Sequence, residues 1–208
     1  MSREKIIATA KAWLGKNEAD GSFKEIIDIY NSIVPLPVGY KVSYTDEWCA
    51  AFVSAVFAKA GLLSIGFPEC SCERMINLYK AAGRWQERDD YVPRMGDLVM
   101  YDWQDGGSGD AKGWADHVGI IIAVEDGVMV AIEGNRNNAV GYRQIAVDAR
   151  YIRGFCLPDY ESLGAAPADD IIAWAMAKGL TDGTDADECI SKRDLWAALR
   201  IIAGGQGM

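Results

Sequence analysis

The only histidine of the chain, His117, lies at the start of an apolar run whose residue types predict a β-strand. A polar turn at 125–127 separates this run from a second apolar run, which predicts the returning strand of a hairpin. If the turn is a three-residue loop, His117 lies opposite Asn135 and diagonal to Glu133, all on one face of the sheet. An imidazole beside a carboxylate or an amide can act as an oriented general base. The hairpin therefore predicts His117 as the base and Glu133 or Asn135 as its partner, and the spacing leaves this choice open.

Cys49 is the candidate nucleophile, because it stands in the first turn of a predicted buried helix over residues 47–61. Thr45 or Asp46 is the expected cap of that helix. A helix N-terminus stabilises a thiolate, and a nearby imidazolium adds to this effect. The competing interpretation is a buried structural cysteine. A cysteine on a helix followed by a histidine and a polar residue on successive strands is, however, the arrangement of papain-like hydrolases.

Four segments resemble, in order and spacing, the motifs of CHAP domains, a branch of the NlpC-like cysteine peptidoglycan hydrolases. The first surrounds the cysteine, the second resembles the strand that follows the family's helices, the third contains the histidine and the fourth closes the hairpin: Tyr44–Ser54, Pro93–Val99, Asp116–Ile121 and Glu133–Asn135. The resemblance covers about residues 1–158 and implies a papain-like α+β fold that cleaves amide bonds of peptidoglycan. It also implies that Cys49 attacks the amide, that His117 transfers the proton, and that Glu133 orients the imidazole with Asn135 assisting nearby.

The expectation about cofactors also comes from this resemblance. Calcium-binding members carry an Asp-rich loop before the nucleophile, whereas the segment 41–48 of this chain holds only Asp46 and Glu47. Calcium is therefore not supported, and we expect no cofactor. Five cysteines without a C-x-x-C pair, together with one histidine, also provide too few well-spaced ligands for a Cys/His zinc site. No metal-binding residues are predicted.

Aromatic side chains that lie near the candidate cysteine and histidine in the sequence are the candidates for stacking against substrate. They are Tyr44, Trp48, Trp103 and Trp114. Core packing is the alternative role for Trp48. The Gly/Asp-rich segment 102–116 is expected to be a solvated surface loop, with substrate or metal binding as the alternative.

Helical patterns precede strand patterns along the chain, and this order predicts an α+β fold with N-terminal helices and an antiparallel sheet. Helices are expected from Ser2 to Gly15, over 23–34 behind a capping box at Ser22, over 47–61, and from Ser71 to Ala82. Strands are expected over 96–103, 117–124, 128–133, 140–147 and 150–157.

The composition changes after residue 158, so we expect a catalytic domain over 1–158, a linker over 159–167 and a small helical hairpin over 168–208. The hairpin resembles a single S-layer homology motif, a family that binds secondary cell-wall polymers. One copy alone implies weak wall binding unless chains associate. Wall-polymer binding, homo-oligomer formation through 168–208 and packing on the catalytic domain are the three alternatives.

Acidic residues outnumber basic ones by 30 to 21, which gives a net charge of −9. Binding to nucleic acid or to an anionic membrane is therefore not expected. The chain has no run of about 18 apolar residues, so no membrane-spanning helix is predicted. Residues 1–15 lack the features of a signal peptide. We expect a protein of the host bacterial cytoplasm that is later released to the cell wall.

These features favour a phage or prophage endolysin. The expected activity is that of a cysteine amidohydrolase acting on bacterial peptidoglycan, as an N-acetylmuramoyl-L-alanine amidase or as a stem or bridge endopeptidase, and the sequence does not distinguish these bonds. The alternatives are an interbacterial effector or wall-remodelling hydrolase, and a catalytically silent wall-binding module.

Overall fold

The computed structural model describes residues 2–87, 90–104 and 113–162. The chain divides into two compact units, Met1–Tyr160 and Glu161–Met208, and nearly all of the described residues belong to the first. The predicted linker extends past the last described residue, and the predicted hairpin over 168–208 lies outside the described residues, so both stay predictions. None of the helices in the described part of the chain is long and apolar enough to cross a membrane.

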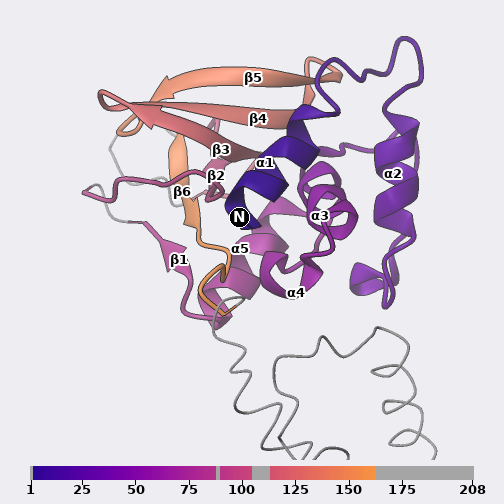
Figure 1. Ribbon diagram of the computed structural model, residues 1–208, viewed down its shortest axis with the longest axis horizontal. Coiled ribbons are helices and arrows are strands. Elements are labelled where there is room, and N and C mark those ends of the chain that lie inside the picture. Colours follow the sequence, from indigo (N-terminus) through magenta and orange to yellow (C-terminus); the bar gives the residue numbers. More distant parts are fainter. Residues whose placement is uncertain (1, 88–89, 105–112, 163–208) are drawn as a thin grey trace, which may run out of the picture. The chain divides into compact units, whose positions relative to one another are not determined.

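The first unit has its helices before its sheet, which confirms the predicted α+β class (Figure 1). The helical elements are α1 (Ser2–Lys11), α2 (Lys24–Asn31), the 3-10 turn η1 (Pro37–Gly39), α3 (Cys49–Lys59), α4 (Leu63–Gly66) and α5 (Cys72–Ala81). The strands are β1 (Trp85–Gln86), β2 (Leu98–Tyr101), β3 (His117–Glu125), β4 (Val128–Arg136), β5 (Ala139–Ala146) and β6 (Ile152–Cys156). They form one antiparallel sheet in the order β1-β6-β2-β3-β4-β5.

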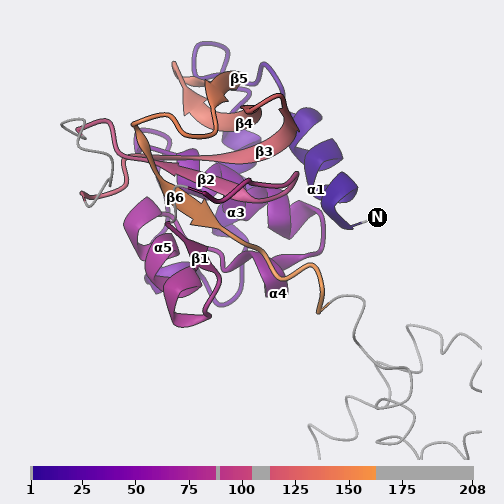
Figure 2. The same ribbon diagram turned by 90° about the vertical axis from the view of Figure 1, so that its left-hand side faces the viewer.

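Helix α3 forms the centre of the core, because every residue from Cys49 to Phe57 is buried. It packs on β3 and β4 and is flanked by α1 and α2, and Figure 1 shows α1 and α3 gathered beside these strands. In the turned view, β2 and β6 pass in front of α3 (Figure 2). A smaller apolar cluster covers the other face of the sheet without any helix residue; its buried members are Val99, Tyr101, Ile121, Met129, Ala131 and Phe155.

The hairpin of β3 and β4 has the register predicted for its histidine end, although the predicted turn was wrong. The turn has two residues, Asp126 and Gly127, both with positive φ, instead of three. This type of turn suits the twist of a hairpin. A register shift between residues 121 and 123 then moves the pairing by one residue, so that Ile120 faces Ile132 as expected. The bulge therefore compensates for the shorter turn.

Two of the predicted helix starts have different outcomes. Ser71 caps α5 as predicted, since its hydroxyl accepts a hydrogen bond from the Arg74 N–H at 3.5 Å. Ser22 does not cap α2: its hydroxyl accepts from the Asn17 N–H at 2.9 Å, and the helix begins at Lys24 without a side-chain cap. The short elements α4 and β1 were not predicted, because they have too few residues for a detectable periodicity.

Asp97, just before β2, fastens the N-terminal helix to the sheet. Its carboxylate is buried and accepts hydrogen bonds from Arg3 Nη1 at 3.0 Å, from the Tyr91 hydroxyl at 2.6 Å and from the Arg94 N–H at 2.8 Å. A buried charge is tolerated when donors of this kind replace its hydration. Asp97 therefore connects α1 and the segment before β2.

Replacing Asp97 by Asn is expected to destabilise the fold by about 2–4 kcal/mol, because the shape is kept while the charge that balances Arg3 is lost. Urea unfolding followed by circular dichroism measures this loss. The matched control is Asp126→Asn in the exposed β3–β4 turn, where Asn tolerates positive φ and a change within roughly 0.5 kcal/mol is expected. Equal losses in the two variants would show that Asp97 has no anchoring role.

Candidate active site

Cys49 is the first residue of α3 and is buried, with 6% of its surface exposed. The residue before it, Trp48, occupies the N-cap position without a side-chain capping bond, so the prediction of a cap at Thr45 or Asp46 was wrong. Asp46 instead accepts hydrogen bonds within its own loop, including one from the Ser43 N–H at 2.7 Å. The N–H groups that open α3 are thus not capped by a side chain. They remain oriented hydrogen-bond donors at the end of the helix that carries Cys49.

His117 is the first residue of β3, where it pairs with Tyr101 of β2, and its imidazole contacts Glu133 of β4. The imidazole Nε2 lies 3.1 Å from Glu133 Oε2, and the Glu133 side chain is fully buried. Asn135 makes its hydrogen bond elsewhere, from its amide to the Glu47 carboxylate. It has a φ of 56° at a register shift between β4 and β5, so the strict alternation of side chains ends before it. Of the two predicted partners, Glu133 is the one that contacts His117.

Arg143 of β5, which was not predicted from the sequence, contacts the other oxygen of Glu133. Its Nε lies 2.7 Å from Glu133 Oε1, and its guanidinium lies over the rings of Trp103 at 4.8 Å and Tyr101 at 5.2 Å. Arg143 faces Ala131 of β4, which puts it on the same face as Glu133. Pairing the two predicted strands in sequence would have revealed this neighbour.

The charges of the site stabilise one another. Burial alone would lower the pKa of His117, but hydrogen bonds to Cys49 and Glu133 outweigh it and raise this pKa to about 9. Burial would raise the pKa of Glu133, and the hydrogen bonds from His117 and Arg143 lower it instead. At neutral pH the arrangement therefore favours an imidazolium between a carboxylate and the sulfur of Cys49.

The pKa of Cys49 is held well below its usual value, first by a hydrogen bond with Cys72 and then by the hydrogen bond and charge of His117, against the opposing effect of burial. Cys72 is the first residue of α5, and its Sγ lies 3.6 Å from Cys49 Sγ. The pKa of Cys72 is raised well above its usual value by the same hydrogen bond. One thiolate and one thiol thus share this contact, and the thiolate belongs to Cys49.

Gly119 provides the space that Glu133 occupies. A Cβ atom at Gly119 would lie 2.8 Å from Glu133 Cγ and 3.1 Å from Ala131 Cβ, closer than side chains normally approach. The missing side chain lets the Glu133 carboxyl lie along β3 toward His117.

Two of the aromatic residues predicted to bind substrate lie on exposed surface after β2 and before β3. The Trp103 ring stacks on Tyr101 at 4.8 Å and lies 6.2 Å from the His117 ring, with 38% of the residue exposed. Trp114 is 75% exposed. The loop between them is described only in part, since residues 105–112 lie outside the described residues. Trp103 is therefore the predicted binding residue that the structure places beside the histidine.

The other two predicted aromatic residues precede α3 and differ in burial. Tyr44 is exposed, and its hydroxyl donates to Asp28 at 2.7 Å. Trp48 is fully buried, and its indole N–H donates to Glu18 at 2.9 Å. A side chain without exposed surface cannot stack against a substrate, so the binding role predicted for Trp48 is corrected to core packing.

The described residues contain no group of three or more His, Cys, Asp or Glu side chains placed to hold a metal ion. Of the two acidic residues before the nucleophile, Asp46 accepts hydrogen bonds from the Tyr40 hydroxyl and the Ser43 N–H. Glu47 accepts one from the Asn135 amide.

A cysteine at a helix N-terminus with a histidine and a carboxylate on adjacent strands is the arrangement of papain-like cysteine hydrolases. Residues 39–135 match the family model of the CHAP domain, so the chain contains a CHAP domain. This match supports a family of peptidoglycan hydrolases of the cysteine-peptidase type. It does not extend to the segment that resembles an S-layer homology motif, which stays unsupported.

Two solved structures are similar to this chain. One is an NlpC/P60 family protein from Bacillus cereus ATCC 10987, with 18% identity and a TM-score of 0.43 over 75% of this chain and 40% of that chain. The other is Ly7917, with 13% identity and a TM-score of 0.37 over 76% of this chain and 63% of that chain. The chain thus spans less than two thirds of either relative. No curated protein matches it.

Since His117 is the only histidine of the chain, its titration can be followed by NMR without assignment. We expect a pKa of about 9, above the usual 6.5. Glu133→Gln should lower this value by about one unit or more, because the negative charge that stabilises the imidazolium is lost. Asn135→Ala, the control, should leave it nearly unchanged. An equal effect of the two substitutions would refute the assignment of Glu133 as the partner.

Adding a methyl group at Gly119 is expected to displace the Glu133 carboxyl from His117. Gly119→Ala should therefore lower the pKa of His117 and cost about 1–3 kcal/mol of stability through overpacking. The matched control is Gly141→Ala on β5, where the new Cβ would meet only the Arg136 side chain, at an ordinary 3.8 Å. NMR titration and urea unfolding test both variants, and an unchanged titration of His117 in Gly119→Ala would contradict the spatial argument.

Proposed function

We propose that this protein is a cysteine amidohydrolase that cleaves amide bonds of bacterial peptidoglycan. The observation that carries the proposal is the set formed by Cys49 at the start of α3, His117 at the start of β3, and a buried Glu133 whose oxygen lies 3.1 Å from the imidazole. The CHAP-domain match supports the substrate class.

In the first step, the Cys49 thiolate attacks the carbonyl carbon of the amide and forms a tetrahedral intermediate. The N–H groups at the start of α3 are placed to stabilise its negative oxygen. The C–N bond then breaks, and the leaving amine takes the proton of the His117 imidazolium. The products of this half-reaction are a thioester on Cys49 and a free amine.

In the second step, neutral His117 removes a proton from water, and the resulting hydroxide attacks the thioester. The C–S bond breaks, the acid product leaves, and the thiolate–imidazolium pair is restored. Because Nε2 of His117 donates to Glu133, Nδ1 is the nitrogen that exchanges protons with Cys49 and the leaving group. Arg143 is a positioning residue, since it contacts Glu133 rather than the imidazole.

The biological setting we propose is that of a phage or prophage endolysin, which stays in the host bacterial cytoplasm until it is released to the cell wall. The exposed aromatic residues Trp103, Trp114 and Tyr44 are the proposed substrate contacts. Binding of a secondary wall polymer or self-association through 168–208 remains our proposal for that segment. An interbacterial effector or wall-remodelling hydrolase would use the same chemistry in another setting, and genes for a holin or for a secretion apparatus nearby distinguish the two.

The decisive experiment is mass spectrometry of the fragments released from purified sacculi of several wall chemotypes. The protein should release defined fragments, and Cys49→Ala should lower the rate by about a thousandfold or more, because the thiolate that attacks the amide is removed. Cys70→Ala, which removes a cysteine outside the site, is the control that should retain activity. Free stem peptides identify an amidase, and cleaved stems or bridges identify an endopeptidase. Absence of fragments from every chemotype would refute hydrolysis and favour a silent wall-binding module.

A further inference from the structure

The proposed mechanism uses one of the two cysteines that meet at the site. Cys72 takes no part in the proton transfers, yet its Sγ lies 3.6 Å from Cys49 Sγ. Both residues open a helix, and both are buried, with 7% and 6% of their surfaces exposed. The two sulfurs are therefore in contact within the core, without bulk water between them.

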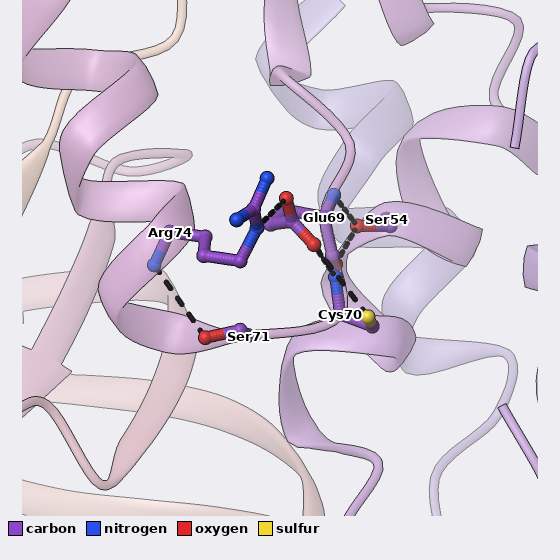
Figure 3. Close-up of polar contacts among 5 residues, drawn as sticks. All are labelled: Ser54, Glu69, Cys70, Ser71 and Arg74. Atoms are coloured by element: carbon purple, nitrogen blue, oxygen red, sulfur yellow. Dashed lines mark hydrogen bonds and ion pairs between the residues drawn. The ribbon is translucent and has the colours of Figure 1, made fainter. Parts of the chain in front are cut away.

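The segment that leads to Cys72 is fixed on the same helix that carries Cys49. The Ser54 hydroxyl of α3 donates to the Glu69 carbonyl at 2.7 Å and accepts from the Glu69 N–H at 2.8 Å (Figure 3). Ser54 is fully buried, so this pair of bonds is shielded from water. It sets the position of the chain three residues before Cys72.

The Glu69 carboxylate then orders the turn that follows. It accepts the Cys70 N–H at 2.8 Å and Arg74 Nε at 2.9 Å, while Ser71 caps α5 (Figure 3). The contacts of Ser71 and Arg74 therefore hold the two ends of the first turn of α5, which contains Cys72. Its contact with Cys49 is therefore a built feature of the fold.

We propose that Cys49 and Cys72 form a reversible disulfide, in which Cys72 is the resolving cysteine that captures Cys49 after oxidation by a peroxide. Attack of the Cys49 thiolate on the peroxide breaks the O–O bond and gives a sulfenic acid and hydroxide, or an alkoxide from an organic peroxide. The Cys72 sulfur then attacks the sulfenic sulfur, the S–S bond forms, and the lost hydroxyl leaves as water with the Cys72 proton. A dithiol reverses the step by thiol–disulfide exchange.

The geometry suits this step. A disulfide has a sulfur separation of about 2.05 Å, so the two sulfurs need to approach by roughly 1.5 Å through side-chain rotation. Two other thiols lie in the described part of the chain: Cys70 Sγ lies against Glu69 Oε1 at 3.5 Å, and Cys156 is fully buried on β6. The consequence for hydrolysis rests on the proposed function, whereas formation of the disulfide does not.

The test uses the full, reduced chain, which is exposed to hydrogen peroxide, blocked with an alkylating reagent and analysed by intact mass and peptide mapping. The protein should lose two hydrogen atoms and give one cross-linked peptide pair that joins Cys49 to Cys72. Its activity on sacculi should fall by more than about tenfold and return with dithiothreitol, since a sulfur within a disulfide is not a nucleophile.

Variants separate the resolving role from general oxidation, each compared with its own unoxidised form. Cys72→Ser should gain oxygen atoms at Cys49 that dithiothreitol does not remove, because sulfinic acid is not reduced by thiols. Cys70→Ser should still form the disulfide. Sulfinic acid at Cys49 in the unchanged protein, or a cross-link between Cys49 and Cys70, would overturn the proposal, and mapping the unchanged protein decides this even if Cys72→Ser does not fold. A disulfide in a protein that never cleaves sacculi would support this pairing and refute the hydrolase.

Discussion

The buried carboxylate of Glu133 is the constraint on which the rest of the site depends. Removing a carboxylate from water costs several kcal/mol unless cations and hydrogen-bond donors replace the lost hydration. His117 from β3 and Arg143 from β5 supply them, one on each oxygen. The three strands must therefore keep their pairing around Glu133, and Gly119 must lack a side chain, since a Cβ there would overlap Glu133. The order of β3, β4 and β5 and the orientation of the imidazole follow from the same charge.

A second close approach connects this charge to the nucleophile. Gly134 follows Glu133 directly, and a Cβ atom there would lie 2.4 Å from Phe52 Cβ of α3. The backbone of β4 thus rests on the helix one turn after Cys49. Two adjacent residues of one strand perform different tasks: Glu133 holds the imidazole, and Gly134 holds the helix that presents the sulfur. The site is formed where the helix layer and the sheet come closest.

Much of this was predictable from the sequence, because periodicity reports which residues share a face of an element. It predicted the α+β class and the juxtaposition of His117 and Glu133. It does not report bulges or the docking of distant elements. The alternation that placed Asn135 beside the histidine ends at a residue with positive φ, and the shorter turn was compensated by a bulge that no pattern revealed. The burial of Trp48 and the position of Cys72 depend on tertiary contacts between helices.

The pair of cysteines shows why a helix N-terminus alone does not select a nucleophile. Cys49 and Cys72 each open a helix, and Cys72 has the better capped one, with Ser71 as its N-cap. Their pKa values nevertheless move in opposite directions. The difference is the histidine: a hydrogen bond and a positive charge from His117 stabilise the thiolate of Cys49, and that thiolate in turn keeps the proton on Cys72. Each helix N-terminus favours the anion of its own cysteine, so the choice between the sulfurs is made by the sheet, through Glu133 and the imidazole that it holds.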